Sequence, residues 1–200
     1  YWAAHNIDSD YIGIVHYRRY FASRKKSIFD AKKRRVISHE ELCAILATTN
    51  VVLPKERHYF IETNYTQYIH AHPAEGMDLA LSLVSAQGPR YQSAVETVKS
   101  RTWVHIYNMF IMKREIFDSY CQWLFDILFQ VEQQLDLSGY SAYDRRVFGF
   151  LGERLLDIYL EANQIPYREV PVMFMEKQNW LIKGAKFLHR KLFGRKEETA

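Results

Sequence analysis

The sequence predicts one α/β domain in which helices pack against a sheet. Short apolar runs with β-branched residues alternate along the chain with longer segments of helical period. Of the 200 residues, 48% are hydrophobic and 25% are charged, as in packed globular domains. Only 8 Gly and 5 Pro are present, which excludes collagen-like and low-complexity chains. A chain of this length buries roughly two-thirds of its unfolded surface, so it can form a proper core.

The first half of the chain contains two expected strands and a capped helix. Residues 11–15 are apolar on both faces of an extended run, which predicts a buried strand. Ser38 and Glu41 have the spacing of a capping box, which predicts that a helix begins there. Residues 50–53 predict a second short apolar strand. Residues 59–73 have no clean period and are expected to form a loop or a partly helical segment.

Further helices and strands are expected downstream. The helices cover residues 77–86, 91–99, 116–135 and 143–163. In the two longest, apolar residues recur at intervals of three and four. Residues 104–112 predict a third strand. Residues 165–174 predict a last strand at a sheet edge, because Pro171 interrupts it.

The charge of the chain predicts anionic partners. The net charge is +4, and basic residues gather at 24–35 and 183–196. From residue 180 the tail alternates apolar and basic residues like a helix that lies on an anionic membrane surface. A helix that packs on the domain with its charges in solvent is the alternative.

Other features of the sequence favour a cytosolic chain. No apolar run reaches the ~18 residues of a membrane-spanning helix, and the N-terminus lacks a signal-peptide pattern. Cys43 and Cys121 are far apart and without a CxxC spacing, which favours reduced thiols. The chain begins at Tyr1 rather than Met, and we expect that an N-terminal part is missing.

The clearest candidate for a ligand site follows the first expected strand. His16, Arg18 and Arg19 come directly after it, and in open α/β sheets ligands bind at the carboxyl ends of strands. Arginine forms bidentate contacts with phosphate oxygens, so the pair suits a diphosphate. A solvated turn with two surface arginines is the alternative.

Three separated motifs resemble one known family. The strings SDYIGIVHYRRYF, NMFIMKREIFDSYCQWLF and RRVFGFLGERLLDIYL occur in this order and cover most of the chain. They resemble the capsular and exopolysaccharide biosynthesis proteins that carry the DUF4422 domain, which look like glycosyltransferases of the GT-A type. The resemblance implies a GT-A-like α/β domain over residues 1–179, with a mixed central sheet flanked by helices. The basic tail then covers 180–200.

The resemblance also implies an activity and partners. The implied reaction moves a sugar from a nucleotide-sugar donor, a UDP-sugar, to a growing bacterial polysaccharide or lipid-linked glycan. The implied location is cytoplasmic, peripheral at the inner face of the cell membrane, without nucleic acid as a partner. Asp10, His16, Arg18 and Arg19 are the expected donor-binding residues. A non-catalytic polyanion-binding module, or a scaffold that keeps the transferase fold, is the alternative.

The sequence departs from the GT-A pattern at the metal site. GT-A enzymes usually hold the donor diphosphate through Mn²⁺ or Mg²⁺ on an Asp-x-Asp motif after a central strand. Here the Asp8-Ser-Asp10 triplet precedes the strand. Two options remain open: His16 binds a divalent metal, or Arg18 and Arg19 neutralise the diphosphate without metal.

Two carboxylates are candidates for the catalytic base. A transferase needs one carboxylate to take the proton of the acceptor hydroxyl, and Asp144 and Glu153 are the candidates. Asp144 lies where it could instead cap a helix. Glu153 lies inside that helix and could instead face solvent.

Three polar or aromatic residues are candidates for contacts with the acceptor sugar. Asn108 follows the third expected strand, although its amide could instead bond its own backbone. Tyr68 and His72 could stack on sugar rings, or belong to a surface loop.

Overall fold

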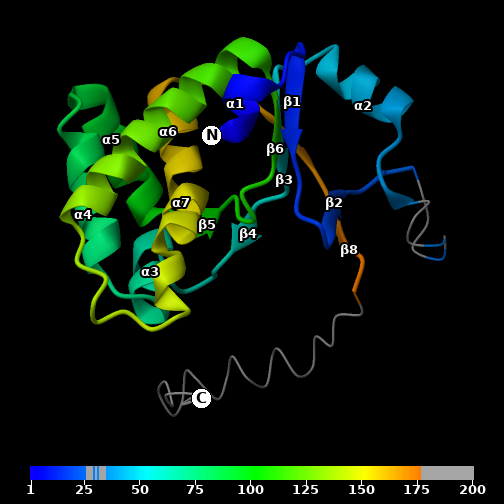
Figure 1. The fold of residues 1–200 in the computed structure, drawn as a ribbon. Coiled ribbons are helices and arrows are strands. Elements are labelled where there is room, and N and C mark those ends of the chain that lie inside the picture. Colours follow the sequence, from blue (N-terminus) through cyan, green and yellow to red (C-terminus); the bar gives the residue numbers. More distant parts are fainter. Residues whose placement is uncertain (26–28, 30, 32–34, 177–200) are drawn as a thin grey trace.

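The computed structural model describes residues 1–25, 29, 31 and 35–176. The tail expected to lie on a membrane falls outside these residues. Figure 1 shows a sheet with one short helix on one side and the other helices on the opposite side.

A mixed four-stranded sheet forms the centre of the domain, in the order β1-β6-β3-β7. Its strands are β1 (Tyr11–Ile14), β6 (Phe110–Lys113), β3 (Val51–Pro54) and β7 (Arg168–Val170). β6 runs antiparallel to β1 and β3, whereas β3 and β7 are parallel. This arrangement confirms the predicted α/β class with a mixed central sheet.

Two small two-stranded sheets lie beside the central one. β2 (Arg19–Phe21) pairs with β8 (Val172–Phe174), and β4 (Arg57–His58) pairs with β5 (Trp103–Val104). Pro171 separates β7 from β8, so the last expected strand is divided between two sheets at its proline.

Seven α-helices and a short 3-10 helix belong to the described residues. They are α1 (Trp2–Asn6), α2 (His39–Leu46), α3 (Asn64–Ala71), α4 (Glu75–Ser85), α5 (Pro89–Ser100), α6 (Arg114–Gln134), η2 (Asp144–Arg146) and α7 (Val147–Ala162). Local sequence explains several starts: the Thr63 and Thr66 side chains form a capping box for α3, and Pro89 occupies the first turn of α5. At the start of α2 the Ser38 hydroxyl accepts a hydrogen bond from the Glu41 backbone N–H, as predicted. The Glu41 carboxylate, however, accepts a hydrogen bond from the Arg24 backbone N–H and does not complete the capping box.

Helices cover both faces of the central sheet. On one face, Val51, Leu53 and Met112 pack with side chains of α6 and α7. On the other face, Val52 and Ile111 pack against the apolar side of α2. A second core joins α3, α4 and α5 to the outer sides of α6 and α7, so α6 and α7 lie between the sheet and an outer helical layer.

Two expected strands differ from the structure. β1 is an edge strand, and Ile14 and Val15 are 37% and 45% exposed, so the prediction of a buried strand was wrong. The strand expected over 104–112 is divided into β5 and β6. Tyr107 and Asn108 separate them with positive φ angles of 86° and 49°, which a β-strand cannot contain.

No helix within the described residues is both long and apolar enough to cross a membrane.

Candidate active site

The central sheet gathers polar segments at one edge. β1, β3 and β7 end there, and β6 begins there because it runs antiparallel to its neighbours. The residues after β1 and β3, and those before β6, therefore meet at the edge where α/β domains usually bind ligands. Three arginines, one half-buried carboxylate and one tyrosine lie together at this edge. We call Arg19, Arg57, Arg154, Glu153 and Tyr107 the arginine site.

Arg19 is held against aromatic rings. Its guanidinium carbon lies 4.4 Å from the ring centre of Tyr107 and 5.7 Å from that of Phe174. Such stacking fixes the plane of the guanidinium and leaves its N–H groups available to a ligand. The buried Nε of Arg19 has no hydrogen-bond partner.

Glu153 is the carboxylate of the arginine site. It projects from α7, and its Oε1 accepts the backbone N–H of Tyr107 at 3.1 Å. Burial raises the pKa of the Glu153 carboxyl, while the charges of Arg154, Arg19 and Arg57 and the Tyr107 amide oppose that shift. A carboxyl with a raised pKa is suited to accept a proton near neutral pH.

Arg154 is a buried cation without a carboxylate partner. It is 6% exposed, and its Nη2 donates to the Tyr59 hydroxyl at 3.2 Å and to Gln67 Oε1 at 2.6 Å. Its Nε and Nη1 are buried without a hydrogen-bond partner. No ion pair joins it to any carboxylate in the described part of the chain. Because an unpaired buried charge is costly, this residue points to an anionic ligand.

The two adjacent arginines of the sequence motif have different surroundings. Arg18 forms an ion pair with Glu176 at 2.9 Å, and both side chains are about half exposed. Arg19 begins β2 and contacts Tyr107. Arg18 lies in the turn before β2, so the pair that was expected to act together is divided between the turn and the strand.

His16 turns the chain between β1 and β2. Its Nδ1 accepts the N–H of Arg18 at 3.2 Å, and its carbonyl accepts the N–H of Arg19 at 2.9 Å. Burial together with the charges of Arg19, Arg18 and Arg146 lowers the His16 pKa, although Glu176 opposes this. The ring is therefore neutral near pH 7, with its proton on Nε2.

The surroundings of His16 do not fit a divalent metal. With Nδ1 occupied by a backbone amide and the proton on Nε2, the ring offers no lone pair, and three arginine charges surround it. Asp10 lies at the opposite end of β1, so the structure does not bring it to His16. Among the described residues, no group of three His, Cys, Asp or Glu side chains is placed to hold a metal. We therefore derive no step through a metal.

Asp144 lies in a neighbouring cluster rather than in the arginine site. Its Oδ2 accepts the Ser141 hydroxyl at 2.6 Å, and its Oδ1 lies 3.7 Å from His72 Nδ1. The helix α7 begins after it, at Val147. The His72 ring stacks on Phe150 at 4.1 Å between centroids. The structure thus brings the predicted residues His72 and Asp144 together, and keeps Glu153 with the arginines.

The other two predicted acceptor residues have contrasting positions. Tyr68 is fully buried, so its ring offers no face to a sugar in this structure. Asn108 is partly exposed beside the arginine site, and its amide donates to the Gly149 carbonyl at 2.9 Å. A Cβ on Gly152 would lie 3.0 Å from Asn108 Oδ1, so glycine there leaves room for this side chain.

Sequence reasoning did not select Arg57, Tyr107 or Arg154. Arg57 follows a buried strand and a proline, which is the same signal that selected Arg18 and Arg19. Arg154 had only the signal of a charge within an apolar helix, which is also typical of a solvated face.

Comparisons with known proteins agree with this architecture. The model of the family described as "Domain of unknown function (DUF4422)" matches residues 1–164. No curated protein matches this sequence. Among solved structures, the chain is similar to WbbM, a bifunctional glycosyltransferase in its apo form, with a TM-score of 0.76 and 26% identity. This similarity covers 88% of the present chain but only 35% of the WbbM chain. Because the family model matches residues 1–164 of the 200, the chain belongs to the DUF4422 family.

Proposed function

We propose that this chain is a glycosyltransferase domain that takes its sugar from a nucleotide diphosphate donor. The observation that supports this proposal most is the arginine site, in which Arg19, Arg57 and Arg154 face the single carboxylate of Glu153. Its excess of positive charge, of which Arg154 is buried and Arg57 is exposed, suits a diphosphate, which carries the opposite charge. The similarity to WbbM, a bifunctional glycosyltransferase, supports the same class of reaction.

In the proposed reaction the arginines act on the leaving group. The bond between the anomeric carbon and the diphosphate oxygen breaks, and its electron pair stays on the diphosphate. Guanidinium groups that are already in place stabilise this developing charge without reorganisation. Arg19, stacked on Tyr107, and Arg154, fixed by Tyr59 and Gln67, are preorganised in this sense.

Glu153 is the proposed base. An acceptor hydroxyl oxygen forms the new bond to the anomeric carbon, and its proton passes to the Glu153 carboxylate. The raised pKa of Glu153 brings its basicity closer to working pH. Asp144, with His72 beside it, is the second candidate for the base.

The finer parts of the proposal rest on the sequence motifs. We propose a UDP-sugar as the donor and a capsular, exopolysaccharide or lipid-linked glycan as the acceptor. The basic tail from residue 180 supports a peripheral position at the inner face of the cell membrane.

Calorimetric titration with UDP and a panel of nucleotide sugars, with and without Mn²⁺, tests the donor site. We expect binding without metal, and we expect Arg19→Ala to weaken it about 10-fold to 100-fold, the scale of lost charged hydrogen bonds. Arg18→Ala should have a much smaller effect because Arg18 is paired with Glu176. Arg90→Ala provides a control, since Arg90 is an exposed arginine on α5 that contacts Tyr91. Absence of binding by the unmodified chain, or equal losses in all three variants, would contradict the proposal.

A further inference from the structure

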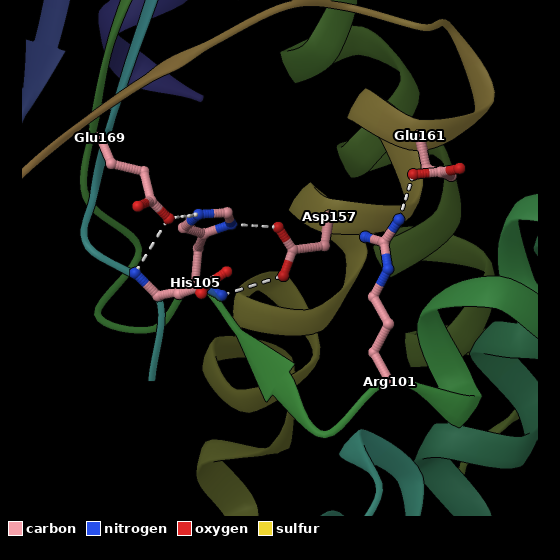
Figure 2. Close-up of polar contacts among 6 residues, drawn as sticks. Arg101, His105, Asp157, Glu161 and Glu169 are labelled. Carbon is pink, nitrogen blue, oxygen red and sulfur yellow. Dashed lines mark hydrogen bonds and ion pairs between the residues drawn. The ribbon is translucent and has the colours of Figure 1, made fainter. Parts of the chain in front are cut away.

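A histidine outside the arginine site is enclosed by two carboxylates. His105 is 1% exposed, and Figure 2 shows its ring between Asp157 and Glu169. Its Nδ1 lies 2.5 Å from Asp157 Oδ1, and its Nε2 lies 2.9 Å from Glu169 Oε1. Ionised carboxylates only accept hydrogen bonds, so both ring nitrogens must donate. The ring is therefore an imidazolium.

The same two carboxylates also bind backbone amides that lead to the arginine site. Asp157 Oδ2 accepts the N–H of His105 at 2.9 Å, and Glu169 Oε1 accepts the N–H of Glu56 at 3.1 Å (Figure 2). Glu56 precedes Arg57, and His105 lies two residues before Tyr107. The His105 ring thus connects α7, β7 and the segment after β3 at the point from which two members of the arginine site project.

We infer that His105 is a positioning residue, whose imidazolium holds Asp157 and Glu169 together and thereby fixes Arg57 and Tyr107 for binding of the donor diphosphate. This inference rests on the proposed function. Within the part of the chain that the structure describes, the His105 ring does not contact a side chain of the arginine site. Its effect is therefore transmitted through the backbone at residues 56–57 and 105–107.

The groups around His105 favour its charged form. Burial acts to lower the His105 pKa, but Asp157 on α7 and Glu169 on β7 together outweigh it and raise that pKa. The Tyr167 ring contacts its edge at 5.0 Å, and burial raises the Tyr167 pKa to about 12, so that hydroxyl stays neutral. The Trp103 ring closes another side at 5.6 Å.

His105→Gln is the decisive variant, because glutamine can donate to one carboxylate but presents its oxygen to the other. We expect amide hydrogen exchange at Glu56 and Tyr107 to accelerate about tenfold or more, with no change in the α5 amides of the outer helical layer. His70→Gln is the matched control, since His70 is an exposed histidine on α3 that pairs with Glu62. Unchanged exchange at both amides in a folded His105→Gln protein would overturn the inference.

The affinity for UDP, measured across a range of pH, distinguishes a positioning role of His105 from a purely structural one. The affinity of the unmodified chain should be highest while His105 is protonated and fall about tenfold as pH rises through its raised pKa. The His105→Gln protein should bind weakly and should lack the tenfold fall that follows the His105 titration. Glu153 and the UDP phosphate titrate in both proteins, so the comparison is between the two profiles. A pH profile of the variant identical in shape to that of the unmodified chain would also overturn the inference.

A second variant keeps the test valid if His105→Gln does not fold. Glu169→Gln removes one charge while retaining an oxygen for the Glu56 amide, and the His105 pKa, measured by NMR of the imidazole nitrogens, should fall. An unchanged His105 titration would contradict the enclosed imidazolium. If the unmodified chain binds no UDP, the proposed function fails, whereas the exchange and NMR measurements still decide the positioning role.

Discussion

Replacing Arg154 by methionine tests whether this family member keeps an unpaired buried cation for a ligand. Arg154 is 6% exposed and forms hydrogen bonds with Tyr59 and Gln67, but it has no carboxylate partner in the described residues. Methionine has a similar unbranched stem, so most packing of the side chain is retained. The variant therefore removes two hydrogen bonds and the charge, together with the attraction of that charge for Glu153.

The structure predicts a small effect on folding and a large effect on binding. Loss of two charged hydrogen bonds costs about 1.5 to 3 kcal/mol each, whereas removal of a buried unpaired ion relieves several kcal/mol of desolvation. These terms nearly cancel, so the free energy of unfolding should change by less than about 1 kcal/mol. UDP affinity should fall about 10-fold to 100-fold, because the diphosphate loses a charged donor.

Urea unfolding and calorimetric UDP titration measure the two effects separately. Arg101→Met is the matched control, because Arg101 is a partly buried arginine that does have an ion-pair partner, Glu161, and that stacks on Trp103. The control should lose stability and keep its UDP affinity. A loss of about 3 to 5 kcal/mol in Arg154→Met, the size expected when a buried ion pair is broken, would refute the reasoning.

Three other predictions use the same measurements or simple extensions of them. Glu153→Gln should lower turnover in a sugar-transfer assay about 10²-fold to 10⁴-fold and leave UDP binding intact or tighter. Asp144→Asn should retain turnover, and the reverse pattern would make Asp144 the base. The free energy of unfolding should be highest below about pH 6.5 and fall as pH rises through the raised pKa of His105, and urea titrations should show no such slope in His105→Gln. The intact chain should sediment with anionic vesicles at low salt, and a chain ending at residue 179 should not. The reason is that each basic residue near an anionic surface contributes about 1 kcal/mol to the binding free energy. Equal sedimentation of both chains would exclude the tail as an anchor.

The sequence predicted the layers of the fold well because they depend on local periodicity. The apolar period of three and four in α6 and α7 and the β-branched run of β3 all correspond to observed elements. Burial of β1 was predicted wrongly, because an apolar run does not reveal whether a strand has one neighbour or two. In the structure β1 pairs only with β6 in the central sheet.

The candidate site was predicted only in part, because its members are far apart along the chain. A strand end followed by basic residues selected Arg18 and Arg19, but only the fold shows that Arg19 reaches Tyr107 and that Arg18 is paired with Glu176. Glu153 was selected for its chemistry. Its neighbours Arg57 and Arg154 were not, because no local pattern distinguishes them from surface charges.

The break in the strand expected over 104–112 and the assembly of the site have one physical cause. The N–H groups of His105 and Tyr107 bond to Asp157 and Glu153, which lie 52 and 46 residues away on α7, instead of to a neighbouring strand. Carboxylates four residues apart on a helix are about 6 Å apart along its axis, and alternate amides of an extended chain have nearly the same spacing, about 6.6 Å. Helix α7 therefore replaces a partner strand for these residues. The chain can then turn through the left-handed Tyr107 and Asn108 before β6 begins, which brings the Tyr107 ring under Arg19.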